Sequence, residues 1–341
     1  MVKRLVIIVI LILLILGSIA YVFLGLNNPK DTQDHSEILI EIPMGSTTGD
    51  IGVILESNGV IKNANMFKLY SRLNGFDNTY VAGAYTLSPS MTTEDICKII
   101  SSGETTSLKF TVPEGYTIYD IADAMSDYSQ LDGDNFLRLV KEGDYSEYEF
   151  LKGAVSGEHR LEGYLFPDTY LLSPGGNEED LIKSMLDRFQ VEYDAIKSDV
   201  EKKKMSLNQI LTVASIIEKE TMHLEDKPLV SSVIYNRLDI GMKLQMDTTI
   251  IYAMRENKVD LTYDDMEYDS PYNTYIVDGL PIGPICCPGR DSIDAAINPA
   301  KTDYYYFVLT DQGDGTIAYS HSHEEFLKDK EAYYAAQDED D

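Results

Sequence analysis

An uncharged run near the N-terminus restricts this chain more than any other feature. Residues 5–26 consist mainly of Ile, Leu and Val, and as an α-helix they would span roughly 33 Å, close to the ~30 Å hydrocarbon core of a bilayer. Lys3 and Arg4 precede the run and acidic residues follow it, which favours a cytoplasmic N-terminus. We therefore expect a cytoplasmic segment at 1–4, a single transmembrane anchor at 5–26 and an extracytoplasmic remainder.

A cleaved signal peptide is the competing interpretation of this run. Its apolar part would be only about 7–15 residues long and would end at a small-residue cleavage site. Gly17, Ser18 and Ala20 are small, but apolar residues continue through Leu24. An uncleaved anchor is the better interpretation, so we expect a single-pass protein of the cell membrane.

The acidic composition excludes several partners and chemistries. The chain has 57 acidic and 28 basic residues and a formal net charge of −29, whereas nucleic-acid binding requires clustered positive charge. No P-loop, dinucleotide, G-x-S-x-G or H-E-x-x-H motif is present, and His321 with His323 is a weak basis for a metal site. Cys97, Cys286 and Cys287 lack metal-binding spacing and are interpreted as small apolar residues. We expect no nucleic acid, metal or cofactor.

Two stretches resemble one another in the first half of the chain. PMGST at 43–47 and PEGYT at 113–117 each follow an apolar strand, turn at Pro-x-Gly and enter an apolar-periodic helix. Strand and helix patterns also alternate irregularly in the second half, which indicates an α+β protein. The expected organisation is a linker at 27–37, small α+β units at 38–105 and 106–175, a mixed α+β domain at 176–336 and an acidic tail at 337–341.

One helix of the second half carries a carboxyl group on its apolar face. Ser206 and Gln209 have the spacing of a capping box, which predicts a helix over residues 207–221. Glu218 continues the line of apolar residues on one helical face, whereas Glu220 points elsewhere. The carboxyl group of Glu218 has two interpretations. It is either a solvent-exposed charge at the end of the helix, which is the commoner case, or a partly desolvated group that can donate a proton.

Polar side chains are concentrated after this helix, namely Gln245, Asp247, Tyr272, Asn273 and Tyr275. They provide more hydrogen-bonding capacity than a packed loop requires. The aromatic stretch at 162–170 suits sugar stacking or simple packing, and its composition favours packing. Because cofactor chemistry is excluded, cleavage of a glycosidic bond by a carboxylic acid remains, a reaction that needs a proton donor and usually a second carboxylate.

Several motifs follow one another in the chain: LEGYLFPDTY at 161–170, ASIIEKET at 214–221, VIYNRL at 233–238, LQMDTTIIYA at 244–253, SPYNTY at 270–275, GLPIGPI at 279–285 and PGRDSIDAAINPA at 288–300. In their residues and in their order along the chain, these motifs resemble those of the MltG (YceG-like) family of endolytic murein transglycosylases. The resemblance extends over almost the whole chain and includes the anchor.

This resemblance implies a LysM-like module at 38–105 and a catalytic domain at 176–336. It implies non-hydrolytic cleavage of the MurNAc-β-1,4-GlcNAc bond in nascent peptidoglycan strands, which leaves 1,6-anhydroMurNAc ends and terminates glycan elongation. The catalytic glutamate of the family falls on Glu218, which would act first as acid and then as base. Peptidoglycan synthases of the same membrane are the implied partners. The residues that would bind sugar or support Glu218 are Glu220, Gln245, Asp247, Tyr272, Asn273 and Tyr275.

The chain departs from the family pattern at two places. The family's C-terminal helix commonly opens with Glu-Glu-His, whereas this chain has Phe326 in the His position. A role for that His is therefore not expected here, unless His321 or His323 substitutes for it in space. Cys286 and Cys287 stand where small or apolar residues are usual. Two other functions remain open: a non-catalytic peptidoglycan-binding or division scaffold, and a hydrolytic muramidase in which water reaches the sugar C1.

Overall fold

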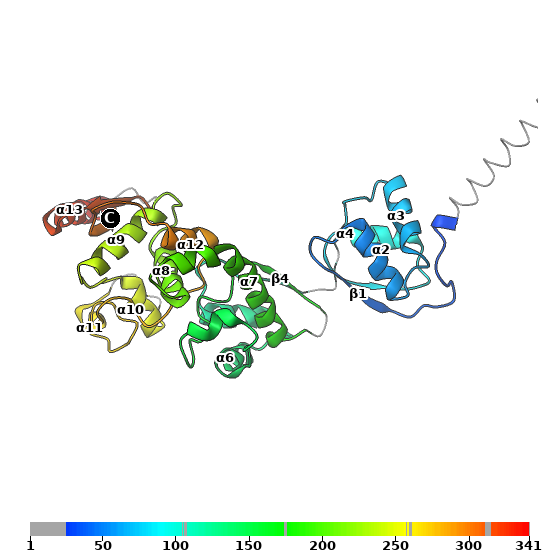
Figure 1. Cartoon of the computed structure of the whole chain (residues 1–341), viewed down its shortest axis with the longest axis horizontal. Helices are drawn as coiled ribbons and strands as arrows, with labels where there is room; N and C mark the ends of the chain where they lie inside the picture. The colour runs from blue at the N-terminus through cyan, green and yellow to red at the C-terminus, as the bar shows by residue number, and fades with distance from the viewer. Residues whose placement is uncertain are drawn as a thin grey trace, which may run out of the picture. The chain divides into compact units, whose positions relative to one another are not determined.

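The chain forms two compact units. The computed structural model describes residues 25–103, 105, 108–173, 176–256, 258, 261–310 and 315–340. Unit 1 contains the described residues up to Lys109 together with 171–176, and unit 2 contains 110–170 together with the residues from Asn177 onward. Helices and two-stranded sheets alternate in both units, so the α+β class is confirmed (Figure 1).

The predicted anchor at 5–26 lies outside the described residues except for Gly25 and Leu26. None of the described helices is long and apolar enough to cross a membrane. Leu26 is buried in the core of unit 1, and its carbonyl accepts a hydrogen bond of 2.8 Å from Thr93 Oγ1. The chain is therefore fixed to unit 1 from Leu26 onward.

Unit 1 is built on one antiparallel strand pair, in which Ile40 of the first strand lies opposite Tyr85 of the second. Both side chains are buried, as are the inward faces of the three helices. The elements are β1 (Ile38–Ile42), α2 (Thr48–Ser57), α3 (Ala64–Leu73), β2 (Gly83–Leu87) and α4 (Thr93–Ser102).

The predicted similarity between the two Pro-x-Gly stretches is confirmed. The glycine of each turn adopts a left-handed φ, 78° in the first and 79° in the second, a conformation that glycine adopts without steric cost. Each turn leads into a capping box, formed by Thr47 with Asp50 at α2 and by Thr117 with Asp120 at α5 (Ile118–Ala124). The same local chemistry therefore starts a helix twice.

Unit 2 is mainly helical. Besides α5 it contains η1 (Met125–Asp127), α6 (Gly133–Glu142), η2 (Glu149–Gly153), α7 (Glu178–Lys202), α8 (Leu207–Glu220), α9 (Lys227–Asp239), α10 (Asp247–Met254), α11 (Tyr263–Met266), α12 (Arg290–Ile297) and α13 (His323–Asp340). It also contains the strand pair β5 (Tyr306–Leu309) with β6 (Ile317–Ser320). A third pair, β3 (Leu108–Thr111) with β4 (Thr169–Leu172), has residues in both units. Helix α13 continues through the acidic residues at 337–340.

Helix α8 is the central helix of unit 2. All residues from Ile210 to Ile217 are buried, because α8 packs against α9, α10 and α12 (Figure 1). The predicted capping box is confirmed: Gln209 N donates to Ser206 Oγ at 3.2 Å, and Ser206 N donates to Gln209 Oε1 at 2.9 Å. The start of α8 is thus set by local sequence and its position by packing.

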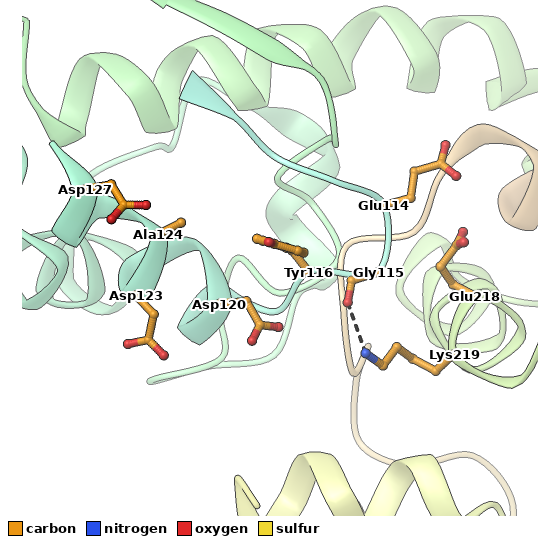
Figure 2. A pocket seen from close by; sticks show the side chains of 9 residues that line it. All are labelled: Glu114, Gly115, Tyr116, Asp120, Asp123, Ala124, Asp127, Glu218 and Lys219. Carbon is orange, nitrogen blue, oxygen red and sulfur yellow. Dashed lines mark hydrogen bonds between the residues drawn. The ribbon is translucent and has the colours of Figure 1, made fainter. Parts of the chain in front are cut away.

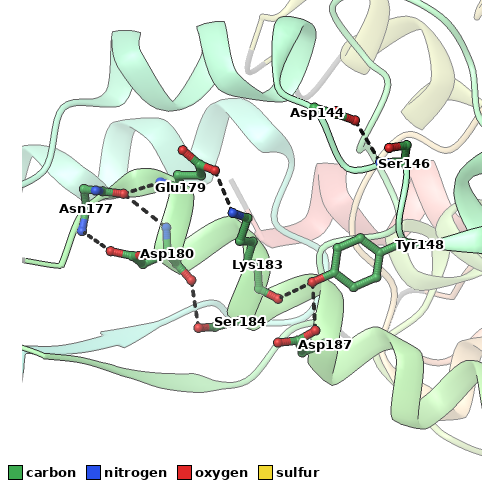
Figure 3. A network of polar contacts seen from close by, with 9 residues as sticks. All are labelled: Asp144, Ser146, Tyr148, Asn177, Glu179, Asp180, Lys183, Ser184 and Asp187. Atoms are coloured by element: carbon green, nitrogen blue, oxygen red, sulfur yellow. Dashed lines mark hydrogen bonds and ion pairs between the residues drawn. The ribbon is translucent and has the colours of Figure 1, made fainter.

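Helix α7 is held by polar contacts at its N-terminal end (Figure 3). Asn177 and Asp180 form its capping box. Tyr148, just before η2, donates its hydroxyl hydrogen to Asp187 Oδ1 at 2.7 Å. Two residues further along, Phe189 lies edge-on to the buried ring of Phe150 in η2, with centroids 4.9 Å apart. These contacts fix the segment before α7 against the helix.

The α8 cap gives a stability prediction. Ser206→Ala removes the acceptor for Gln209 N and should lower the free energy of unfolding of unit 2 by about 1 kcal/mol. Urea denaturation followed by far-UV circular dichroism measures this change. Ser206→Asp keeps a capping oxygen and should retain most of the stability, so equal losses in the two variants would contradict the role of the cap.

Candidate active site

Glu218 lies near the C-terminal end of α8 and is nearly enclosed. Its side chain is 9% exposed and forms an ion pair with Lys227, the first residue of α9, which is 4% exposed. Lys227 Nζ lies 3.1 Å from Oε1 and 3.4 Å from Oε2, and the backbone N–H of Gly289 donates to Oε2 at 2.9 Å. Each of these contacts comes from a donor, which suits an ionised carboxylate.

The loop before α12 connects α8 with the second Pro-x-Gly turn. At the α8 side, Ile285 N donates to Ser215 Oγ at 3.0 Å. At the turn, Gly115 N donates to Cys287 O at 2.9 Å and Cys287 N donates to Tyr116 O at 2.8 Å. These backbone hydrogen bonds bring the turn beside Glu218.

The turn places a second carboxyl group, that of Glu114, next to Glu218. A Cβ atom at position 289 would lie only 2.0 Å from Glu114 Oε1, so the Glu114 carboxyl packs directly on Gly289. No described residue forms a hydrogen bond or ion pair with this carboxyl. Partial desolvation, and then the negative charge of Glu218, raise the pKa of Glu114, while Lys227 acts in the opposite direction.

The two carboxyl groups line an open cavity of about 640 Å³, a volume within the range of small-molecule sites. Figure 2 shows α5 along one wall and α8 along another. Lys219 is the cation among the lining residues, and its Nζ donates to Gly115 O at 3.3 Å. The remaining lining residues are Tyr116, Asp120, Asp123, Ala124 and Asp127.

Glu220, the other carboxyl of the α8 motif, faces a different cluster. Thr248 Oγ1 donates to Glu220 Oε1 at 2.6 Å. Burial raises the pKa of Glu220 to about 7, although the hydrogen bond from Thr248 opposes the rise. Tyr275 donates its hydroxyl hydrogen to Asp247 Oδ1 at 2.6 Å. Glu220, Asp247 and Tyr275 therefore gather beside the start of α10, and none of them lines the cavity of Glu218.

The other predicted supporting residues belong to the same region. Asn273 is buried and donates to the carbonyl oxygens of Met266, at the end of α11, and of Tyr268, at 3.0 and 2.9 Å. Tyr272 is 4% exposed and packs edge-on against Tyr252 with centroids 4.9 Å apart. The side chain of Gln245 is exposed, and its backbone has a positive φ of 49°. Of these three residues, only Gln245 is open to a ligand.

Glu162 is a fully buried carboxyl behind the α5 wall. It accepts hydrogen bonds from Tyr252 OH at 2.9 Å and from the backbone N–H of Ile118, the first residue of α5, at 3.2 Å. Burial raises the pKa of Glu162 to about 8, although both donors oppose the rise. Glu162 therefore holds the start of α5. Its aromatic neighbours in the 162–170 stretch are buried as well, which supports packing: Tyr164, Phe166 and Tyr170.

The position where the family has His lies away from the cavity. Phe326 stacks on Tyr306 of β5, with centroids 5.4 Å apart and planes 26° apart. His321 and His323 lie near the same hairpin, in contact with aromatic rings. None of the three side chains is among the residues that line the cavity of Glu218.

The cysteines are buried free thiols. Burial raises the pKa of Cys286 and Cys287 well above the usual value of a thiol, which keeps them protonated and unreactive. In the described part of the chain, no group of three or more His, Cys, Asp or Glu side chains is arranged to hold a metal ion.

Comparison with known proteins identifies the family. The model of the YceG-like family matches residues 40–332. The chain belongs to the YceG-like family. It is 36% identical over 339 residues to the endolytic murein transglycosylase of Bacillus subtilis (strain 168), which covers 96% of this chain and 93% of that protein.

Two further proteins are similar to this chain. The chain is 33% identical over 326 residues to the endolytic murein transglycosylase of Streptococcus pneumoniae (strain D39), a match that covers 87% of this chain and 58% of that protein. A crystal structure of a YceG-like protein from Listeria monocytogenes matches with a TM-score of 0.61 at 38% identity, covering 86% of this chain and 99% of that chain.

Sequence reasoning missed two residues of this YceG-like site. Lys227 belongs to another helix than Glu218, so no helical periodicity relates them. Glu114 stands in a motif that the sequence did single out, and the signal was its contrast with the first copy of the turn, which has Met44 at the same place. A polar residue where a similar turn carries an apolar one indicates a role other than forming the turn.

The buried ion pair gives a second prediction for this YceG-like chain. Lys227→Met should destabilise unit 2 by roughly 3 kcal/mol, because it leaves the Glu218 carboxylate buried without its cation. Adding Glu218→Gln removes that charge and should recover much of the loss. Urea denaturation of the four proteins forms a double-mutant cycle, and strictly additive effects would contradict the pairing.

Glu162 gives a prediction about pH. Its pKa is about 8 in the folded protein and about 4.3 in an unfolded chain. The folded state therefore binds more protons between these values, so this group makes stability fall as pH rises, by at most ~1.4 kcal/mol per pH unit. Glu162→Gln should flatten the decline in unfolding free energy between pH 5 and 8, and an unchanged slope would refute the assignment.

Proposed function

We propose that this protein is a membrane-anchored lytic transglycosylase, which cleaves the β-1,4 bond between MurNAc and GlcNAc of peptidoglycan and leaves 1,6-anhydroMurNAc ends. The observation that carries the proposal is Glu218, a nearly enclosed carboxyl held by Lys227 and Gly289 at the wall of an open cavity. The relatives from Bacillus subtilis and Streptococcus pneumoniae, both named endolytic murein transglycosylases, support it.

Glu218 is the centre of the proton transfers in this reaction. The oxygen of the departing GlcNAc needs a proton as its bond to C1 of MurNAc breaks. The O6 hydroxyl of MurNAc loses a proton as it bonds to the same C1. Because the nucleophile belongs to the substrate, its attack is intramolecular and benefits from a high effective concentration. No water and no carboxylate nucleophile is needed, which distinguishes this reaction from the usual glycosidase scheme.

The residues beside α10 have a supporting role in this proposal. The exposed side chains of Gln245 and Asp247 are available to a glycan, and Glu220 and Tyr275 hold the start of α10 through their hydrogen bonds. Because Tyr272 and Asn273 are buried, they act by shaping the loop rather than by touching sugar.

The proposal extends to the location and cellular role of the protein. The apolar run at 5–26 would anchor the protein with unit 2 on the outer side of the membrane, where peptidoglycan is made. Unit 1 contains the segment that corresponds to the LysM-like module, and such a module would hold the glycan. An endolytic enzyme in that place would cut nascent strands beside the membrane synthases and terminate their elongation.

The test of the proposed function is digestion of peptidoglycan by the full-length protein. Wild type should produce 1,6-anhydroMurNAc ends, detected by mass spectrometry. Glu218→Gln should lower the rate at least about 100-fold, because the amide cannot transfer the proton. Gln190→Glu, on the exposed side of α7, serves as a control with an altered charge and should keep the wild-type rate.

Other products would identify other functions. Reducing MurNAc ends in place of anhydro ends would show a muramidase. Full activity of the Glu218→Gln protein would contradict the role of Glu218. Absence of any cleavage, with retained binding to peptidoglycan, would show a scaffold.

A further inference from the structure

Glu114 is not required by the turn in which it stands. The chain makes this Pro-x-Gly turn twice, with Gly45 and Gly115 at φ of 78° and 79° and with a capping box after each. The first copy has Met44 in the equivalent position, and that side chain is 80% exposed. Since methionine suits the same backbone, local structure does not account for a carboxyl group at position 114.

The surroundings of Glu114 place it in the active site. Its carboxyl packs on Gly289, the residue whose N–H donates to Glu218 Oε2 at 2.9 Å. Glu114 and Glu218 line the same cavity, as Figure 2 shows. The absence of a Cβ at Gly289 leaves the space that the Glu114 carboxyl occupies, while the backbone N–H of the same residue binds Glu218.

The two carboxyl groups have unequal environments. Glu218 has a cation and an N–H donor, whereas Glu114 has no hydrogen-bond or ion-pair partner among the described residues. Two adjacent carboxyl groups do not readily ionise together, and the one without donors from the protein is the more readily protonated of the two. Partial desolvation and Glu218 raise the pKa of Glu114 in this sense, Asp291 of α12 adds to the rise, and Lys227 opposes it. The other charged groups that line the cavity are Asp120 and Asp123 of α5, Asp127 of η1 and Lys219 of α8.

The chemistry of the proposed reaction allows its two proton transfers to be carried out by two different carboxyl groups. A 1,6-anhydro bridge lies on the face of the sugar ring from which the 4-linked β-oxygen departs. Both proton transfers therefore occur on one side of the ring. Two carboxyl groups in one stretch of cavity wall can each serve one of these oxygens.

We propose that Glu114 is a second catalytic residue, which donates the proton to the departing oxygen while Glu218 accepts the proton of the O6 hydroxyl. The bond between C1 of MurNAc and O4 of GlcNAc breaks, and a bond between C1 and O6 forms. The proton of Glu114 goes to O4 and the O6 proton goes to Glu218. Transfer of that proton from Glu218 to the Glu114 carboxylate restores both groups. This inference rests on the proposed transglycosylase function and refines the role of Glu218.

The test compares two leaving groups with the full-length protein. One substrate is a natural glycan strand, and the other is a GlcNAc–MurNAc oligosaccharide with 4-nitrophenol on its terminal MurNAc, since nitrophenolate departs without a proton. Glu114→Gln should be at least about 100-fold slower on the glycan and within about threefold of wild type on the nitrophenyl substrate. Glu218→Gln should be slow on both, because the O6 proton still needs an acceptor.

The pH dependence provides a second measurement on the natural glycan. An acid catalyst must be protonated, so wild-type activity should fall as pH rises through the raised pKa of Glu114. The residual activity of Glu114→Gln should lack this decline. Glu114→Met, which has the residue of the first turn, checks that the fold tolerates the change.

The measurements distinguish failure of this inference from failure of the proposed function. Equal losses of Glu114→Gln on both substrates, or a pH profile identical to that of wild type, would overturn this inference and make Glu114 structural. A wild-type rate for Glu114→Gln together with an inactive Glu218→Gln would overturn it and leave the proposed function standing. Absence of anhydroMurNAc ends from wild type would overturn the proposed function itself.

Discussion

The backbone at Gly289 is the contact on which the arrangement of the site depends. Its N–H donates to Glu218 at 2.9 Å, and its bare Cα leaves the space that the Glu114 carboxyl occupies. The loop before it is hydrogen-bonded to α8 and to the 113–116 turn. Because these contacts join three segments far apart in sequence, the cavity exists only when unit 2 is folded as a whole.

The buried ionisable groups of unit 2 have different surroundings and therefore different roles. Glu218 and Lys227 compensate each other in a nearly enclosed pair, whereas Glu162 is held behind the cavity wall with its pKa raised to about 8. A buried ion pair such as Glu218 with Lys227 stabilises a fold little and is costly to break by removing one partner. Its presence beside an open cavity is therefore better explained by chemistry than by stability.

Sequence reasoning predicted what local chemistry decides. The capping box of Ser206 and Gln209 fixed the start of α8, and the apolar stripe placed Glu218 on the face that is enclosed in the structure. Contacts between segments left no such pattern, since Lys219 meets Gly115 across 104 residues. Aromatic composition at 162–170 favoured packing over sugar binding, and the burial of these rings supports packing. The anchor at 5–26 lies almost wholly outside the described residues and stays a prediction.

The most direct test of this account is the activity of Gly289→Ala. The added Cβ would meet the Glu114 carboxyl at 2.0 Å and displace this flexible side chain, while the N–H to Glu218 remains. Formation of anhydroMurNAc ends should fall about 100-fold, with the unfolding free energy lowered by less than about 1 kcal/mol. A Gly289→Ala protein that is folded and cleaves peptidoglycan at the wild-type rate would contradict the account.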